Sequence, residues 1–230
     1  MGGAQACACI KSPNDESIFK EFFKELLLVE KPVQDVYDVI TIKKGSKVTN
    51  EINEKKWFII IESILNNPNN KEISINYWQK VIKYSKENSK ENYLILGLFF
   101  FPFDKLEDCK TYFIKFYNQM REETNEEKMK IISKDDLKNV LTLYIYLISR
   151  GAAEDLQALS NDPKNMVDYF NTVFSNENIE KYVNEKFLSN DEDEIDINTF
   201  LNNHYKLIND NSLIRNEISE NYYKNNIEKK

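Results

Sequence analysis

The sequence IISKDDLKNVL, residues 131 to 141, is the starting point for predicting the fold, because its pattern recurs at two other places in the chain. In each copy an isoleucine is followed by Ser or Asp, and a large apolar residue stands five positions after the isoleucine. The isoleucines are Ile73, Ile132 and Ile195, and the apolar residues are Trp78, Leu137 and Phe200. A short polar residue before an apolar period is typical of the start of a helix. The repeat therefore indicates helices that begin in the same way.

Apolar residues recur with helical spacing over most of the chain, and only five Gly and five Pro are present among its 230 residues. This pattern predicts a mainly α protein with about nine to ten helices in one or two lobes. A first helix is predicted to follow Asn14 or Asp15 and to end before Pro32, and a loop is predicted around Gly45. Further helices are predicted at roughly 54 to 67, 76 to 86, 91 to 100, 108 to 123, 134 to 149, 164 to 174, 177 to 188, 197 to 209 and 213 to 223.

We expect four regions along the chain. Residues 1 to 14 have no apolar period and predict a flexible tail, and residues 224 to 230 predict a frayed end. Between them we place one helical lobe at 15 to 150 and a second at 151 to 223, because Gly151 can end a helix.

Phenylalanines dominate the first predicted helix, where the apolar residues are Ile18, Phe19, Phe22, Phe23, Leu26 and Leu27. Packing of this stripe into the core is its more common use. The alternative is an interfacial helix on a membrane, with Lys20 and Lys24 facing lipid headgroups.

The repeat resembles the exit of an EF-hand loop, where one isoleucine joins a short β-bridge with the partner loop and a helix follows. In this resemblance the segments 54 to 67, 108 to 123 and 177 to 188 are the incoming helices. The resemblance implies a fold of degenerate EF-hand-like helix pairs.

Calcium ligands are largely missing when each isoleucine is placed at loop position 8. The ligand positions then hold Asn66, Pro68, Asn70, Ser74 and Tyr77 in the first loop, Asn125, Glu127, Met129, Ser133 and Asp136 in the second, and Leu188, Asn190, Glu192, Asp196 and Thr199 in the third. No loop has the bidentate Glu at position 12, and Lys71, Lys130 and Asp193 replace the glycine of the sharp turn. We therefore predict no metal site and no cofactor, with one weak calcium candidate at Asn190, Glu192 and Asp196.

Residues 16 to 150 resemble the EF-hand-like helical region that precedes the TLDc domain in acylated members of that family. The resemblance rests on NKEISINYWQKVIKYSKENSKENYLILGLFFF at 70 to 101 and on the MG at the amino terminus. The chain has no room for a TLDc domain, so the resemblance implies a docking or adaptor module.

The amino terminus, MGGAQACACIKS, predicts a lipid anchor. Gly2 becomes the terminal residue after removal of Met1 and meets the requirement for N-myristoylation, although Ala6 replaces the Ser or Thr of the usual pattern. One myristoyl chain binds membranes only marginally, and Lys11 alone makes no polybasic patch. Cys7 and Cys9 are the candidates for S-palmitoylation, which supplies the second membrane signal.

Two other interpretations of this terminus remain open. Cys7 and Cys9 are, in the first, unmodified thiols in a disordered tail behind a chance MGG start. In the second they bind zinc, for which only Cys109 and His204 remain as partners.

Composition argues against several classes of function. A net charge of −7 argues against nucleic acid as a partner. The apolar run at 93 to 103 is about half as long as the roughly 20 residues of a membrane-spanning helix, and the terminus lacks a secretory signal, so we expect a peripheral protein on the cytosolic face of a membrane.

Catalytic patterns are missing as well. His204 is the only histidine, and it stands in an apolar helical period that predicts a packed or half-exposed side chain. Glycines are isolated, so nucleotide-binding loops are not predicted, and Asp135 and Asp136 suit a helix N-terminus better than a catalytic pair. We predict no catalytic residue, no enzyme and no small-molecule substrate.

These observations favour an acyl-anchored peripheral membrane scaffold or adaptor that binds a protein partner through grooves between helix pairs. One alternative is a calcium-responsive EF-hand sensor with a lipid anchor. The other is a structural subunit of a larger assembly, whose aromatic surfaces are covered by other chains.

Overall fold

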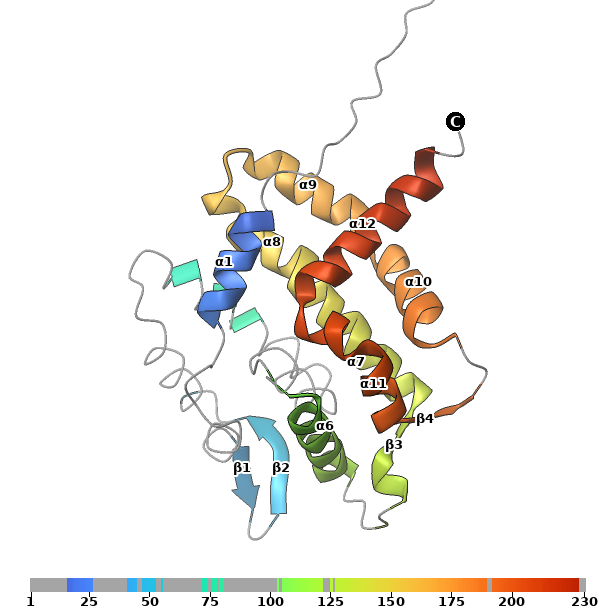
Figure 1. Ribbon diagram of the computed structural model, residues 1–230. Helices are drawn as coiled ribbons and strands as arrows, with labels where there is room; N and C mark the ends of the chain where they lie inside the picture. The colour runs from blue at the N-terminus through green and yellow to red at the C-terminus, as the bar shows by residue number, and fades with distance from the viewer. Residues whose placement is uncertain are drawn as a thin grey trace, which may run out of the picture.

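The computed structural model describes residues 16–26, 41–44, 47–52, 105–121, 127–189 and 192–227, and single positions at 55, 72, 73, 76, 77, 79, 80, 103 and 125. This part of the chain is mostly helical (Figure 1), as the sequence predicts. Its α-helices are α1 (Glu16–Leu26), α6 (Leu106–Arg121), α7 (Lys134–Tyr146), α8 (Ala152–Leu156), α9 (Pro163–Val173), α10 (Asn176–Phe187), α11 (Ile197–Asn209) and α12 (Asn211–Ile227). Its strands are β1 (Thr41–Lys44), β2 (Lys47–Ile52), β3 (Ile131–Ser133) and β4 (Glu194–Asp196).

Side-chain caps set where the central helices begin. Ser133 accepts a hydrogen bond from the backbone N–H of Asp136 at the start of α7, and Asp196 accepts one from Thr199 at the start of α11. Asp162 and Ser175 cap α9 and α10 in the same way. A cap satisfies one of the N–H groups that lack a partner in the first helical turn. The predicted helices at 134, 164, 177 and 197 therefore begin within one residue of the observed ones.

Two helix–loop–helix units face each other across a short antiparallel pair of strands. The first unit is α6–β3–α7 and the second is α10–β4–α11 (Figure 1). In the strand pair Ile132 lies directly opposite Ile195, and both side chains are buried. Helix α7 packs along α10, and α6 packs along α11. Two of the three isoleucines singled out by the repeat thus meet at the centre of this arrangement.

A π-helical turn, Leu147–Gly151, joins α7 directly to α8. A π turn leaves backbone carbonyl groups without their usual intrahelical partner. Side chains from other segments donate to three carbonyl oxygens of this turn: Tyr77 Oη to Leu147 O at 3.1 Å, Arg215 Nη1 to Ile148 O at 3.0 Å, and Lys80 Nζ to Gly151 O at 2.9 Å. The turn is therefore where α12, Tyr77 and Lys80 attach to α7.

Gly151 does not end a helix, contrary to our expectation. Its backbone is helical, and an added Cβ would lie 3.2 Å from Tyr146 O and 3.3 Å from the Tyr146 ring. Close packing, and not a change of direction, explains the glycine. The boundary predicted between residues 150 and 151 falls inside a continuous helical segment, and one core cluster contains residues from both sides of it.

The phenylalanines of α1 pack into this core. Phe19, Phe22 and Phe23 are at most 7% exposed, and Lys20 is exposed. Phe19 stacks on Phe170 of α9 with ring centroids 4.7 Å apart. The core-packing interpretation of the stripe is confirmed for these three residues.

Several elements differ from the prediction. Strands β1 and β2 form an antiparallel hairpin on either side of the predicted loop at Gly45, where β-branched residues such as Thr41, Val48 and Thr49 favour extended backbone. Helix α8 was not predicted, and α12 continues to Ile227, beyond the predicted end at 223. The predicted helices at 54 to 67, 76 to 86 and 91 to 100 lie largely outside the described residues.

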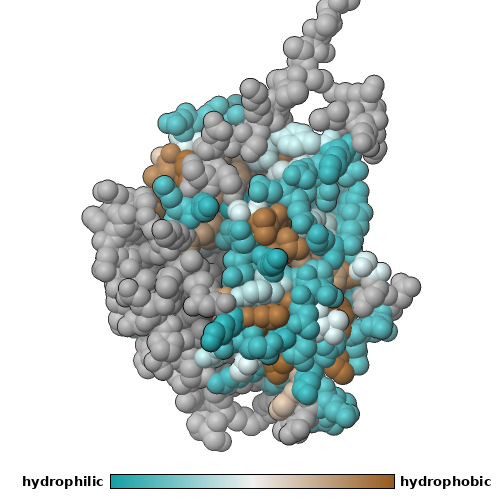
Figure 2. Space-filling view, in the orientation of Figure 1, coloured by the Kyte–Doolittle hydropathy of each residue, from teal (hydrophilic) through white to brown (hydrophobic). Residues whose placement is uncertain are grey.

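The surface of the described part is mainly polar on the face drawn in Figure 2. Hydrophilic residues cover most of the coloured part of that face, and hydrophobic ones form small separate groups. Leu159 and Leu213, each 39% exposed, are the exposed large hydrophobic residues within the described ranges. Apolar side chains are therefore concentrated in the core.

Candidate functional site

The residues predicted to carry acyl groups lie outside the described part of the chain. Gly2, Cys7 and Cys9 all precede Glu16, where α1 begins. Their lipidation therefore stays a prediction. Cys109, which we considered as a zinc partner, is buried on α6, and burial raises the pKa of its thiol to about 12. Such a thiol is protonated at neutral pH and is a poor metal ligand or nucleophile.

The candidate calcium ligands have separate environments. Asn190 lies outside the described residues, and Glu192 is exposed. The Asp196 carboxylate accepts a hydrogen bond of 2.7 Å from the backbone N–H of Thr199 and so acts as the N-cap of α11. Within the ranges that the structure describes, no three His, Cys, Asp or Glu side chains come close enough together to hold a metal ion.

Side chains from α6 hold the loop between α6 and α7. Asn118 Nδ2 donates to the carbonyl oxygen of Met129 at 2.7 Å, and Tyr117 Oη donates to Asp136 Oδ2 at 2.8 Å. The backbone N–H of Ser133 donates to Tyr117 Oη at 3.3 Å. Met129, Ser133 and Asp136 occupy predicted calcium positions 5, 9 and 12 of this loop. All three are bonded to the protein itself, so the loop is closed by internal hydrogen bonds.

His204 lies partly buried on α11, as its apolar period predicts. Its ring packs against Phe187 and Phe200, with centroids 4.9 and 5.1 Å away. Burial lowers the pKa of His204, the positive charge of Lys186 lowers it further, and Glu217 opposes this shift. The imidazole is therefore neutral at pH 7 and is a packing residue in an aromatic setting.

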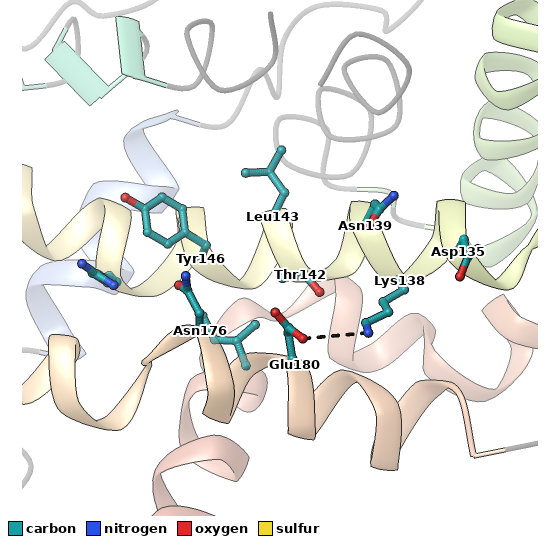
Figure 3. Close-up of a pocket in the computed structure, with 10 residues that line it drawn as sticks. Asp135, Lys138, Asn139, Thr142, Leu143, Tyr146, Asn176 and Glu180 are labelled. Atoms are coloured by element: carbon teal, nitrogen blue, oxygen red, sulfur yellow. Dashed lines mark ion pairs between the residues drawn. The ribbon is translucent and has the colours of Figure 1, made fainter. Parts of the chain in front are cut away.

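A groove of about 760 Å³ runs along α7 beside the start of α10 (Figure 3). The labelled side chains of α7 extend from Asp135 at one end to Tyr146 at the other, and Asn176 and Glu180 come from α10. The described lining residues are Asp135, Lys138, Asn139, Thr142, Leu143, Tyr146, Arg150, Asn176, Ile179 and Glu180. The opposite face of α7 is buried in the core.

Charges are distributed unevenly along the groove. Lys138 Nζ lies 3.9 Å from Glu180 Oε2, so these two charges neutralise each other near its middle. Among the described residues, none forms an ion pair with Asp135 at one end or with Arg150 at the other. The guanidinium of Arg150 lies 6.0 Å from the centroid of the Tyr146 ring. The groove therefore has a negative end, an apolar and neutral middle, and a positive end.

Sequence reasoning predicted grooves between helix pairs but named no lining residue. The information is present in the helix predicted at 134 to 149, whose polar face includes Asp135, Lys138, Asn139 and Thr142. Leu143 and Tyr146 interrupt this face with apolar groups. The neighbour that completes the groove, α10, begins more than 20 residues later, and its position requires the tertiary structure.

In the part of the chain that the structure describes, no helix has both the length and the apolar character needed to span a bilayer. Comparisons of the chain with protein-family models, with curated proteins and with solved structures found no match.

Proposed function

We propose that this protein is an acyl-anchored peripheral membrane adaptor whose α7–α10 groove binds a protein partner. The observation that carries the proposal is the groove itself: about 760 Å³, lined by both apolar and charged residues, on a helix whose other face is fixed in the core. Grooves between helices are common docking sites for amphipathic helices.

The two helix–loop–helix units are, in this proposal, an EF-hand-like pair that keeps its packing without a metal. The antiparallel contact of Ile132 with Ile195 supports this, as does the packing of α7 on α10 and of α6 on α11. Hydrogen bonds from Tyr117 and Asn118 close the first loop, which removes the need for calcium. The body is then a permanent docking platform and not a sensor.

The membrane anchor in this proposal is N-myristoyl on Gly2 together with S-palmitoyl on Cys7 and Cys9. The support is the sequence of the tail and the short distance along the chain to α1, whose phenylalanines fasten it to the body. One acyl chain binds a membrane reversibly, and additional chains make the binding stable.

Fractionation of cells that express the full chain tests the anchor. We expect Gly2→Ala to move the protein from the membrane to the soluble fraction, and Cys7→Ser with Cys9→Ser to weaken retention. Gly3→Ala is the matched control and should leave retention unchanged, because Gly3 is not the acylated residue. Unchanged membrane retention in all of these variants would contradict the anchor.

Calorimetric titration with calcium separates the adaptor from the sensor. The adaptor predicts no heat of binding and no change in melting temperature on adding calcium, because the loop polar groups are already bonded to the protein. A calcium-dependent rise in melting temperature would favour the sensor.

A further inference from the structure

We infer that the partner segment is a helix of about four turns that runs antiparallel to α7, with an acidic first turn at Arg150 and a basic last turn at Asp135. This inference rests on the proposed function, because it specifies the partner of the same groove. Three features of the groove define the segment: its length, its apolar middle and its charged ends.

The length follows from the lining residues of α7. From Asp135 to Arg150 the helical segment extends roughly 20 Å, at about 1.5 Å per residue. A partner helix that lies along this distance needs about 15 residues. Shorter helices would leave one of the two charged ends uncovered.

Apolar contacts come from the middle of the groove. Leu143 and Tyr146 of α7 and Ile179 of α10 line it there. A partner helix reaches such a row with apolar side chains at i, i+3, i+4 and i+7. Burial of this row supplies most of the affinity.

The charged ends select the direction of the partner. Within the described ranges neither Arg150 nor Asp135 forms an ion pair, so Arg150 can bind a carboxylate and Asp135 a cationic side chain, whereas Lys138 and Glu180 already pair with each other. Acidic residues stabilise the first turn of a helix and basic residues the last turn. When the first turn of the partner helix lies at Arg150, its acidic residues pair with Arg150 and also interact favourably with the helix dipole. The basic residues of its last turn do the same at Asp135. The reverse direction would place these charges against Arg150 and Asp135 with the wrong sign.

Two polar atoms of the groove have no hydrogen-bond partner among the residues that the structure describes. They are Thr142 Oγ1 in the middle and Arg150 Nε at the positive end. Polar atoms that are shielded from water and unbonded are costly. A carboxylate that binds the Arg150 guanidinium forms charge-assisted hydrogen bonds, which adds to the preference for an acidic turn at this end.

The test uses the full chain and a defined probe. The probe is a labelled, side-chain-stapled helical peptide of about 15 residues, with Glu in its first turn, Lys in its last turn and Leu at i, i+3, i+4 and i+7. Fluorescence anisotropy gives its affinity. We expect Arg150→Glu and Asp135→Lys each to weaken binding about tenfold, which corresponds to about 1.4 kcal/mol, and Leu143→Asp to abolish it.

Lys206→Glu is the matched control, because it reverses one exposed charge on α11, outside the groove. It should leave the affinity unchanged. Circular dichroism establishes that each variant is folded, and Arg150→Gln repeats the charge test with a milder change. The direction is read by NMR: a nitroxide on the peptide amino terminus should broaden the amide signals near Arg150 and not those near Asp135.

Several outcomes would overturn the inference. They are no binding of the probe, equal weakening by Lys206→Glu, or broadening at the Asp135 end. Binding of phosphatidylserine vesicles that is lost in Arg150→Glu, with peptide binding unaffected, would assign Arg150 to lipid headgroups instead. None of these results changes the fractionation of the Gly2 and Cys7 variants, so failure of the partner chemistry and failure of the anchor are distinguishable.

Discussion

Arg215 of α12 donates a hydrogen bond of 3.0 Å to the carbonyl oxygen of Ile148, which lies in the π turn after α7. The same guanidinium lies 4.9 Å from the centroid of the Phe19 ring and 5.5 Å from that of Phe23. Arg215 is 2% exposed, so both kinds of contact are formed away from water. One buried cation therefore connects α1, α12 and the π turn, and it ties the segment next to the predicted anchor to the body.

We expect Arg215→Met to destabilise the protein by about 3 kcal/mol, because the Ile148 carbonyl loses its donor and the two rings lose a cation–π contact. Chemical denaturation measures the free energy of unfolding. Amide hydrogen exchange in α1 should also become faster. Asn216→Ala, at the exposed neighbour, should change stability by no more than about 0.5 kcal/mol. If both variants were equally stable, the connecting role of Arg215 would be wrong.

Asn118→Ala tests whether internal hydrogen bonds close the loop between α6 and α7. We expect a loss of about 1–3 kcal/mol in the free energy of unfolding, because the carbonyl oxygen of Met129 loses its 2.7 Å donor. Asn202→Ala, at an exposed position on α11, is the control and should have little effect. The loss should be the same with calcium and with a chelator. Recovery of stability on adding calcium would mean that the loop binds the ion.

The role of Asp196 can be separated into capping and calcium binding. We expect Asp196→Ala to destabilise the protein by about 1 kcal/mol, since α11 loses its N-cap. Asp196→Asn keeps an oxygen that can accept from Thr199, so it should be nearly as stable as the unchanged protein. Thermal melts measured with and without calcium provide the comparison. If Asp196 were a calcium ligand, calcium would raise the melting temperature of the unchanged protein, and this rise would be smaller in both variants.

Sequence patterns predicted those parts of the fold that depend on local chemistry. Ser133 and Asp196 precede apolar periods, so the starts of α7 and α11 follow from the sequence. The buried side of α1 follows from the spacing of Phe19, Phe22 and Phe23. These features need no knowledge of which helices are neighbours.

Other parts required the tertiary structure. Glycine is common at helix ends, but the close approach of Tyr146 explains why a glycine stands at position 151. The buried Arg215 donates to a carbonyl oxygen in a π turn more than 60 residues away. The groove depends on the packing of α10 against α7. Lipidation of Gly2, Cys7 and Cys9 stays a prediction from the sequence.

His204 should make the stability of the protein depend on pH in mildly acidic solution. Its pKa in the folded protein lies below the ordinary value of 6.5, because burial and the charge of Lys186 disfavour the imidazolium. The unfolded chain therefore binds a proton at a higher pH than the folded chain does. The stabilising contribution of the neutral ring is present above pH 6.5 and is lost as the pH falls through the lower folded pKa.

Denaturation at a series of pH values should show a steeper fall in the free energy of unfolding within this pH window for the unchanged protein than for His204→Gln, which cannot titrate. Glu217→Gln should lower the pKa of His204 further, because the carboxylate that favours the imidazolium is removed; the fall should still begin near pH 6.5 but should extend to a lower pH and become larger. Identical pH profiles for the unchanged protein and for His204→Gln would rule out this assignment, since the carboxylates common to both would then account for the whole acid dependence.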